Sequence, residues 1–546
     1  MENVHWIGQS KEAPPERSSM AAFGSVAVVP FQHKKLSSVN YSCRYFYANG
    51  WKKKKKLCFQ RKRWIVSSTC PPEETSPISV SFTSAPVPHL SHFLTDLDTF
   101  PHPFLLQDAT SYRPLNLNFI SEQDGVINKV VWNKQEPQNL VIYPRAGPRE
   151  RIVFDPKSVK AAIVTCGGLC PGLNTVIREL TECLRYQYGV VDIFGVLQGY
   201  RGFYSKEWIR LDPERVDAIH KLGGTILGSS RGGFDLNKIV DAIVQRGIHQ
   251  VYVIGGDGTI RGAAQLSEEC RRRKLRVTVA SIPKTIDNDI PIIDKSFGFD
   301  TAVQEASKAI DAAHTEVSCF PNGIGIVKLM GRNSGFIALY ASLSSREVDC
   351  CLIPEVPFVI HGRGGLMEYV AKCLSERGKM VLVVAEGAGQ EYVGNDPSVE
   401  QLDASGNKKL GDIGHFLYEE IESTWKKQGM EVSMKYIDPT YMIRAVASNA
   451  SDNIYCTLLA HSAVHGAFAG YTGFTVGPIH GRHAYIPMTE IVTAQKQVDL
   501  RDRMWSRLVN STGQPDFSPR NIPKGFQGPC NIYSSPQQSQ SQESIL

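Results

Sequence analysis

The sequence predicts an α/β protein built from two doubly wound, Rossmann-like domains with the active site between them. Apolar, β-branched runs end repeatedly in turns that contain glycine, and segments with helical periodicity follow these turns. Glycine-rich turns cluster before about residue 299, and turns with isolated charged side chains follow the strands after it. Alternating strands and helices are typical of parallel sheets, which bind ligands at the carboxyl ends of their strands.

The first strand expected in the core is 161–164, and it leads into the loop 166–174, which contains three glycines. A helix is expected at 175–186, so its N-terminus could face a phosphate group. The turn at 228–232, Gly-Ser-Ser-Arg-Gly, follows. Its arginine can neutralise phosphate charge, and its last glycine lets the backbone approach a ligand.

Two later turns are acidic. The strand 251–254 ends in the run 255–259, Gly-Gly-Asp-Gly-Thr, and a helix is expected at 262–272. The strand 277–282 ends in the run 283–289, Pro-Lys-Thr-Ile-Asp-Asn-Asp. Both runs leave the carboxyl end of a predicted parallel strand, so their side chains should meet at one edge of the sheet.

These residue types suit phosphoryl transfer, in which catalysis consists mainly of positioning the group and neutralising its charge. Asp257 could hold Mg²⁺ beside a polyphosphate that packs against glycine backbone. Asp287 and Asp289 would point the same way in an extended run, one toward a substrate hydroxyl and the other toward the metal. Thr285 offers a hydroxyl to the substrate. Taken singly, each run also fits a polar turn or a helix N-terminus without a ligand.

Three places in the second half carry charge in a similar setting. The strand 324–328 ends at Met330-Gly331-Arg332, before a helix expected at 335–343. The strand 381–384 ends at Glu386-Gly387, and Tyr441-Met442-Ile443-Arg444 carries a further arginine. Arginine can stabilise developing charge or bind a phosphate through charge-assisted hydrogen bonds. Each charge alone is more often part of a surface ion pair.

Together, these motifs resemble the phosphofructokinase family from about Arg145 to about Ile486, and within it the plant ATP-dependent group. The resemblance implies the phosphofructokinase fold and a glycolytic kinase that transfers the γ-phosphate of ATP to the 1-hydroxyl of D-fructose 6-phosphate. It implies Asp287 as the general base, Arg332 and Thr285 as the other catalytic residues, and Asp257 as the Mg²⁺ ligand. The implied ATP contacts are Gly167, Arg231, Gly232, Gly256, Asp257, Gly258 and Thr259. The implied sugar-phosphate contacts are Thr285, Ile286, Asp287, Met330, Gly331, Arg332, Glu386, Tyr441, Met442, Ile443 and Arg444.

Two positions bear on the phosphoryl donor. Pyrophosphate-using relatives carry aspartate where this chain has Gly258, and an aspartate there would intrude on the α-phosphate of a nucleotide. Lys284 indicates the opposite, because pyrophosphate enzymes carry lysine there and bacterial ATP enzymes carry glycine. A side chain that blocks a nucleotide sterically excludes it more strongly than an added lysine favours pyrophosphate. Gly258 and Lys284 taken together therefore favour ATP as the donor.

Other functions fit parts of the pattern. A pyrophosphate-dependent phosphofructokinase remains the nearest alternative. A catalytically weak regulatory subunit of the same fold is less consistent with the retained Asp257, Asp287, Arg332 and Arg444. NAD kinases and diacylglycerol kinases share the turn at 255–259 but lack the other motifs. The resemblance also implies an allosteric homotetramer, and Arg178 resembles a bacterial effector-site position.

The basic charge is concentrated at the amino end. The formal net charge is +6, and residues 17–72 contain no Asp or Glu but include five consecutive lysines at 52–56. A basic, Ser-rich stretch without acids is typical of an organellar transit peptide, so a plastid (chloroplast) location is expected, with the cytoplasm as the alternative. A solvated tail or a nuclear-localisation signal would also explain the lysine run. A nucleic-acid partner is not expected. A membrane partner is not expected either, because the apolar segment 26–31 is too short to span a bilayer.

The expected domain boundaries follow from composition and motif order. Residues 70–110 are rich in Pro, Ser and Thr and are expected to form a linker without a packed core, and residues after about 515 are rich in Gln, Ser and Pro and are expected to be disordered. The predicted parts are a disordered transit peptide at 1–70, a linker and lead-in at 71–155, a nucleotide-binding α/β domain at 156–300, a sugar-phosphate-binding α/β domain with helices returning to the first at 301–490, and a C-terminal extension at 491–546.

Overall fold

The computed structural model describes residues 80–106, 118–131, 138–205, 207–393 and 409–519. The predicted transit peptide at 1–70 lies outside these residues, as does the tail beyond 519. Within the described ranges, no helix is long and apolar enough to cross a membrane.

The larger sheet carries the predicted nucleotide turns. In the described part of the chain it has seven strands in the order β16-β15-β10-β9-β6-β7-β8. They are β6 Lys160–Thr165, β7 Asp192–Val196, β8 Ile209–Arg210, β9 Gln250–Gly255, β10 Thr278–Pro283, β15 Phe474–Ile479 and β16 Arg482–Pro487. The inner pairs are parallel, and β8 and β16 join the two edges antiparallel. The turns after β6, β9 and β10 therefore leave the sheet at the same edge.

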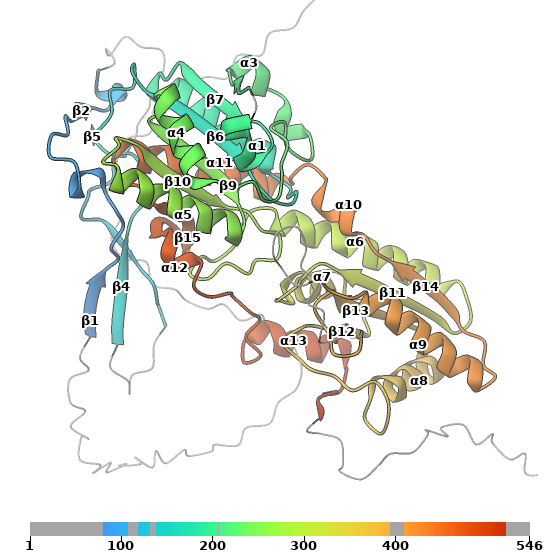
Figure 1. Ribbon diagram of the computed structural model, residues 1–546. Helices are drawn as coiled ribbons and strands as arrows, with labels where there is room; N and C mark the ends of the chain where they lie inside the picture. The colour runs from blue at the N-terminus through green and yellow to red at the C-terminus, as the bar shows by residue number, and fades with distance from the viewer. Residues whose placement is uncertain (1–79, 107–117, 132–137, 206, 394–408, 520–546) are drawn as a thin grey trace, which may run out of the picture. The chain divides into compact units, whose positions relative to one another are not determined.

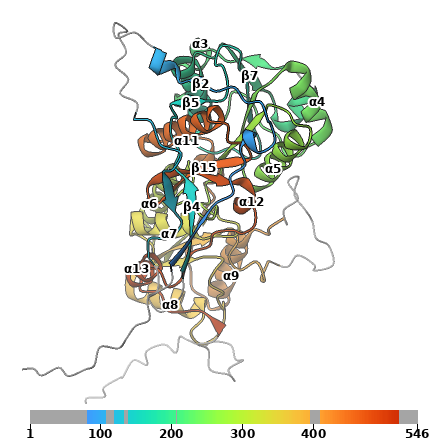
Figure 2. The same cartoon turned by 90° about the vertical axis from the view of Figure 1, so that its left-hand side faces the viewer.

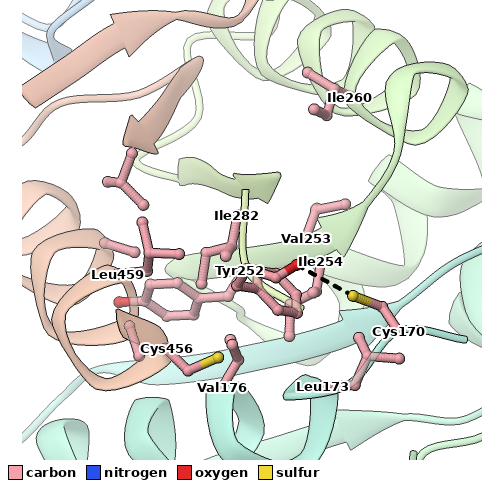
Figure 3. Close-up of a cluster of buried hydrophobic side chains, with 14 of the residues drawn as sticks. Cys170, Leu173, Val176, Tyr252, Val253, Ile254, Ile260, Ile282, Cys456 and Leu459 are labelled. Carbon is pink, nitrogen blue, oxygen red and sulfur yellow. Dashed lines mark hydrogen bonds between the residues drawn. The ribbon is translucent and has the colours of Figure 1, made fainter. Parts of the chain in front are cut away.

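Helices cover both faces of this sheet, with α5 on one side and α11 on the other (Figure 2). The longer ones are α1 Leu173–Glu182, which continues as a π-helix over Cys183–Tyr188, α4 Leu236–Arg246, α5 Asp257–Arg272 and α11 Ala450–Phe468. Figure 3 shows Tyr252 and Ile282 of the sheet packed with side chains of α1 and α11, among them Val176 and Leu459. All four side chains are fully buried. Burial of such a side chain contributes about 1.5–3 kcal/mol, which fixes the strands that carry the turns.

The smaller sheet carries the turns of the second half. Counting described residues alone, it has four parallel strands in the order β12-β13-β11-β14. They are β11 Gly323–Leu329, β12 Cys350–Leu352, β13 Lys379–Ala385 and β14 Ser433–Ile437. Helices α6 Phe299–Ser318 and α7 Phe336–Ser345 lie on one face, and α8 Leu366–Arg377 and α9 Ile413–Lys427 lie on the other (Figure 1). Leu329 pairs with Ala385, so the turns that follow β11 and β13 lie side by side.

The strands predicted at 161–164, 251–254, 277–282, 324–328 and 381–384 are confirmed within one or two residues as β6, β9, β10, β11 and β13. The predicted helices correspond to α1, α5 and α7, but α5 begins at Asp257 rather than at 262. Glycines at the start of this helix obscured its true first turn, because glycine weakens the helical pattern.

Residues 80–106 differ from the expected linker without a packed core. Strand β1 Val80–Ser84 pairs in parallel with β4 Gln138–Pro144, which also pairs antiparallel with β3 Gly125–Ile127. Leu90 is fully buried, and His89 Nε2 lies 2.7 Å from the carbonyl oxygen of Ala469, at the end of α11. A Pro- and Ser-rich composition disfavours an independent core, but single apolar side chains here pack into a core supplied by distant residues.

The carboxyl-terminal extension is ordered further than expected. Helix α12 Met488–Ile491, at the boundary with the preceding domain, packs on α5, and α13 Arg503–Thr512, within the extension, packs on α7. Phe517 is buried, so order continues past the predicted limit of about 515 to the end of the described residues at 519. The remaining short elements are β2 Phe100–Pro101, β5 Arg151–Ile152, η1 Leu90–His92, η2 Pro103–Leu106, η4 Gly199–Arg201, α2 Gly202–Ser205, α3 Pro213–Val216, η5 Ile219–Lys221 and α10 Thr440–Arg444.

Candidate active site

The turn after β9 places a carboxylate at a helix N-terminus. Asp257 is the first residue of α5, and Gly256 precedes it in an extended conformation. A Cβ built at Gly256 would lie 3.4 Å from the carbonyl oxygen of Lys284, whereas one built at Gly258 would have no described atom within 4 Å outside its own helical turn. The space beside Gly258 is therefore open. Thr259 lies in the same first helical turn.

The acidic run after β10 is a tight turn, which corrects the expectation of an extended run. Asn288 has a φ of 56°, and its side-chain oxygen accepts a hydrogen bond from the N–H of Ser296 at 3.1 Å. The hydroxyl of Thr285 accepts from the N–H of Asp287 at 3.1 Å and donates to Asp289 Oδ1 at 3.0 Å. The i, i+2 rule for strands does not apply here because the left-handed asparagine reverses the chain between the two aspartates.

Asp287 is the most perturbed carboxyl group of the site. Its Oδ1 atom is buried, and no described residue donates a hydrogen bond to it. Burial raises the pKa of Asp287, the nearby carboxylates of Asp289 and Glu386 raise it further, and Arg332 and Lys284 oppose the shift. These neighbours come from turns on both sheets. The structure thus brings Asp287, Arg332 and Glu386 into one electrostatic environment.

Asp257 and Asp289 are the carboxylates that could hold a metal. Burial raises the pKa of Asp289, and the charge of Asp257 adds to that rise, so the two groups repel one another. The described residues contain no group of three or more His, Cys, Asp or Glu side chains arranged around a metal position. Mg²⁺ commonly binds one or two carboxylates and completes its coordination with phosphate oxygens and water. This pair fits that ion.

The turns after β11 and β13 are held together by their backbones. Gly331 has a φ of 133°, and Gly387 N–H donates to its carbonyl oxygen at 3.1 Å. A Cβ at Gly387 would lie 1.8 Å from the carbonyl oxygen of Arg332, so no side chain fits there. Ser334 Oγ donates to the carbonyl oxygen of Asp287 at 3.1 Å, which ties this turn to the acidic one. Met330 is half-buried.

Glu386, which follows β13, also has a raised pKa. Burial is the main cause, and Arg332 and Lys328 oppose it. A carboxylate that is partly desolvated beside an arginine can accept hydrogen bonds from a polar ligand without losing its charge partner.

The loop after β6 contacts the turn at 228–232. Gly167 N–H donates to Ser230 O at 3.1 Å, and Ser229 Oγ donates to Gly167 O at 2.5 Å. A Cβ at Gly167 would lie 3.7 Å from Lys284 Nζ, so the lysine side chain reaches this loop. Burial lowers the pKa of Lys284. Arg231 and Gly232 are exposed at the end of the turn, where a phosphate could reach them.

Helix α10 presents only part of the predicted phosphate segment. Ile443 is fully buried and Tyr441 and Met442 are largely exposed. Ile286 is buried as well, so a ligand would contact the backbone of these two isoleucines. The Arg444 guanidinium lies 5.0 Å from the centre of the Tyr441 ring, and it forms no ion pair within the described ranges. Its charge remains available to an anion.

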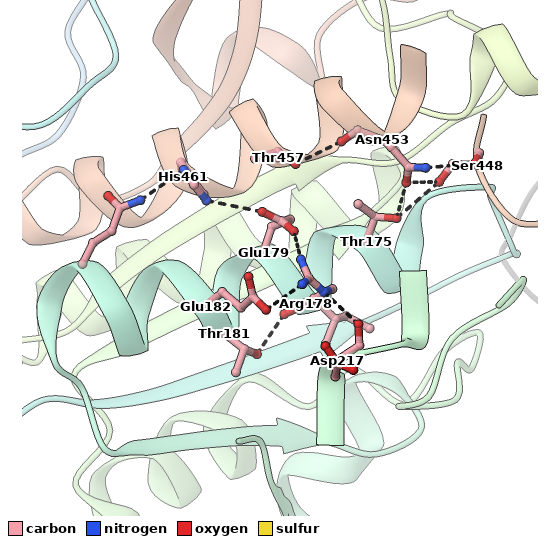
Figure 4. Close-up of polar contacts among 12 residues, drawn as sticks. Thr175, Arg178, Glu179, Thr181, Glu182, Asp217, Ser448, Asn453, Thr457 and His461 are labelled. Carbon is pink, nitrogen blue, oxygen red and sulfur yellow. Dashed lines mark hydrogen bonds and ion pairs between the residues drawn. The ribbon is translucent and has the colours of Figure 1, made fainter. Parts of the chain in front are cut away.

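Arg178 has protein partners (Figure 4). It pairs with Glu179 at 2.5 Å and Glu182 at 2.8 Å, and its Nε donates to Asp217 O at 3.1 Å. Glu179 also lies 3.5 Å from His461 of α11. These contacts connect α1 with its neighbours and account for the arginine without an effector.

One segment near the site was missed from the sequence. Gln495 Nε2 lies 3.5 Å from Asp257 Oδ2, and Lys496 N–H donates to Asp289 O at 2.7 Å. A lysine and two glutamines carry no motif, and only the fold brings residues 495–498 to the acidic turns.

Comparison with known proteins agrees with this arrangement. The family model described as phosphofructokinase matches residues 160–467. The chain is 58% identical to ATP-dependent 6-phosphofructokinase 7 of Arabidopsis thaliana, over 79% of this chain and 88% of that relative. It is 56% identical to ATP-dependent 6-phosphofructokinase 4, chloroplastic, of the same plant, over 80% of this chain and 82% of that relative.

The crystal structure of a pyrophosphate-dependent phosphofructokinase from Marinobacter aquaeolei is similar with a TM-score of 0.54 and 20% identity, covering 68% of this chain and 95% of that one. At this identity the likeness bears on the fold, and it confirms the predicted α/β class. The family match and the two plant relatives go further: the chain belongs to the phosphofructokinase family.

Proposed function

We propose that this chain is an ATP-dependent 6-phosphofructokinase, which transfers the γ-phosphate of ATP to the 1-hydroxyl of D-fructose 6-phosphate and releases ADP and fructose 1,6-bisphosphate. The observation that carries the proposal is the state of Asp287. Its Oδ1 atom is buried without a donor from any described residue, its pKa is raised, and turns of both sheets surround it. A general base needs this combination of raised basicity and an acceptor atom that is not used by another donor.

The proposal assigns a residue to each step of the reaction. Asp287 takes the proton of the sugar 1-hydroxyl while the hydroxyl oxygen attacks the γ-phosphorus of ATP. The bond between the γ-phosphorus and the oxygen that bridges it to the β-phosphorus breaks, and ADP leaves. Arg332 stabilises the charge that develops on the transferring group. Thr285 orients Asp289 and the Asp287 backbone through its two hydrogen bonds. Glu386 accepts sugar hydroxyls, and Tyr441 to Arg444 bind the 6-phosphate, with Arg444 as the charge-assisted donor.

The ATP side is supported by the first sheet. The turns that would receive the nucleotide contain the residues assigned to ATP, which are Gly167, Arg231, Gly232, Gly256, Gly258 and Thr259. Asp257, with Asp289 beside it, would hold Mg²⁺, which when bound neutralises charge on the phosphate oxygens.

Open space beside Gly258 supports ATP as the donor. Because a Cβ at this position would meet no described atom within 4 Å outside its own helical turn, an aspartate would fit sterically here, and its side chain would project into the space left for the ligand. Lys284, whose side chain reaches the loop at Gly167, is the feature shared with pyrophosphate enzymes.

The test is a steady-state assay of the full chain with fructose 6-phosphate and either ATP or pyrophosphate, each with Mg²⁺. Turnover with ATP at least tenfold above pyrophosphate is expected. The variant Gly258→Asp should fold normally and raise the KM for ATP by about tenfold or more, since about 1.4 kcal/mol of lost binding corresponds to a factor of ten. Turnover with pyrophosphate alone would contradict the choice of donor, and no turnover with either would favour a regulatory subunit.

We also propose a plastid location and a homotetrameric, allosteric assembly. The location is supported by the basic, acid-free stretch 17–72 and by the chloroplastic name of a relative at 56% identity. A fluorescent fusion of the first hundred residues should enter plastids, and a cytoplasmic signal would refute the location. Light scattering of the purified chain would measure the assembly.

A further inference from the structure

Residues 495–498 connect three turns that carry the proposed catalytic groups. Gln495 reaches Asp257 after β9, and Lys496 contacts the turn after β10. Gln497 Nε2 lies 3.5 Å from Asn333 O after β11, and Val498 N–H donates to Glu355 Oε1 at 2.8 Å. Four consecutive residues therefore span the turns of Asp257, Asp287 and Arg332. We call residues 495–498 the strap.

Glu355 anchors the far end of the strap. Its two carboxylate oxygens accept the N–H of Gly335 at 3.0 and 3.1 Å, in addition to the N–H of Val498. Gly335 is the N-cap of α7, three residues after Arg332. The buried Val498 and this carboxylate thus fix the strap to the start of the helix that follows the arginine turn.

Helices hold both ends of the surrounding segment. On the side that precedes the strap, α12 packs on α5, the helix that begins at Asp257. On the side that follows it, α13 packs on α7. Because the strap residues have no regular secondary structure, their position depends on these packed ends and on their own hydrogen bonds.

Lys496 makes the most contacts of the four. Its Nζ atom donates to Ile293 O at 3.1 Å and to Asp294 O at 2.9 Å, and its backbone N–H donates to Asp289 O at 2.7 Å. The same ammonium group lies 5.5 Å from the centre of the Phe336 ring, in the first turn of α7. The side chain of Lys496 thus holds residues 293–294 against the helix that follows Arg332, and its backbone N–H holds Asp289, two residues after Asp287.

We propose that Lys496 is a positioning residue, which fixes the turn of Asp287 relative to that of Arg332 for phosphoryl transfer. The proposal rests on the proposed function for its reaction but on the strap contacts for its geometry. Lys496 touches no predicted reacting atom and acts through the main chain of residues 289–294. A misplacement of about 1 Å between reacting groups can lower a rate about a hundredfold, so its loss should reduce kcat.

The test compares Lys496→Met with Lys496→Arg and with a matched control. The methionine variant loses both carbonyl contacts of the ammonium group and keeps the backbone N–H, and the arginine variant keeps the charge and its donors. The control is Arg149→Met, because Arg149 is buried and likewise donates to two main-chain carbonyls, Ile120 O at 3.0 Å and Arg145 O at 2.8 Å, in the lead-in segment. Loss of general stability should therefore be similar in the two methionine variants.

Two readouts are needed for each full-length variant. Steady-state kinetics should show a kcat about 10- to 100-fold lower for Lys496→Met with KM values for ATP and fructose 6-phosphate within about threefold, partial recovery in Lys496→Arg, and wild-type kcat in the control. Hydrogen exchange should accelerate at residues 285–296 in Lys496→Met and remain as in the wild type in the control. Thermal unfolding confirms that each variant is folded at the assay temperature.

The two proposals fail differently. If wild-type protein does not phosphorylate fructose 6-phosphate, the proposed function is wrong, and the exchange of 285–296 still decides whether Lys496 holds this turn. Unchanged exchange in Lys496→Met, or an unchanged kcat in an active enzyme, would overturn the positioning role. An equal kcat loss in Arg149→Met would show that the effect is a general consequence of lost stability.

Discussion

The turns of the two sheets differ in charge at the point where they approach Asp287. The turns after β9 and β10 gather Asp257, Asp287 and Asp289, and the cation beside them, Lys284, has a pKa lowered by burial. The second half supplies Arg332 and Arg444, and Glu386 is the carboxylate there that raises the pKa of Asp287. Concentrated negative charge makes a carboxylate more basic and attracts a cation, whereas the arginines suit anions. Under the proposed function, the first sheet would supply the base and the metal ligands, and the second would supply most of the contacts to the sugar phosphate.

Removing the base should have the largest effect. Asp287→Asn keeps the shape of the side chain but cannot accept the proton, so kcat should fall by about 10²- to 10⁴-fold while the KM for ATP changes little. The control is Asp294→Asn in the same loop, whose carboxylate caps the N–H groups of His480 and Gly481 at 3.0 and 2.7 Å. Steady-state kinetics would contradict the role if the loss at Asp287 stayed below tenfold.

Removing a cation from the second half should affect binding instead. Arg444→Ala should raise the KM for fructose 6-phosphate by about 10- to 100-fold, because a hydrogen bond to a charged group contributes about 1.5–3 kcal/mol. The conservative variant Arg444→Lys should recover part of this loss, since it keeps the charge but not the planar donors. Substrate titrations at saturating ATP measure both, and an unchanged KM would remove Arg444 from the phosphate site.

The smallest expected effect is a shift in pH dependence that links the two groups of turns. Asp287 must be deprotonated to act, and its pKa is raised, so kcat/KM should fall as pH drops through a value above that of an ordinary aspartate. Glu386→Gln removes a negative neighbour, lowers the pKa of Asp287 and should move this acid limb to lower pH. Arg332→Gln removes a positive neighbour and should move it to higher pH. If the acid limb of the kcat/KM profile stayed at the same pH in both variants, a group other than Asp287 would be responsible for it.

The sequence predicted the strands and their charged turns because these depend on local pattern. Short, β-branched apolar runs such as 251–254 and 381–384, ended by glycine and charged residues, favour buried strands, and parallel strands bring their carboxyl ends together. The conformation of the acidic run was not predictable, since it depends on Asn288 being held by Ser296 eight residues later. Lys496 was not predictable either, because its partners lie about 200 residues away and no pattern within the segment marks it.

The arrangement of the larger sheet constrains how the chain folds. Strand β10 pairs with β15, and Ser281 and Thr475, whose hydroxyls meet across this pair, are 194 residues apart. All of the smaller sheet is synthesised between them, which takes about 10–40 s at about 5–20 residues per second. During that interval a strand rich in β-branched residues has an unpaired edge, the kind of edge that associates with other chains. Newly made chains should therefore depend on chaperones until β15 emerges, and a protein truncated before residue 474 should aggregate even though every acidic turn is present.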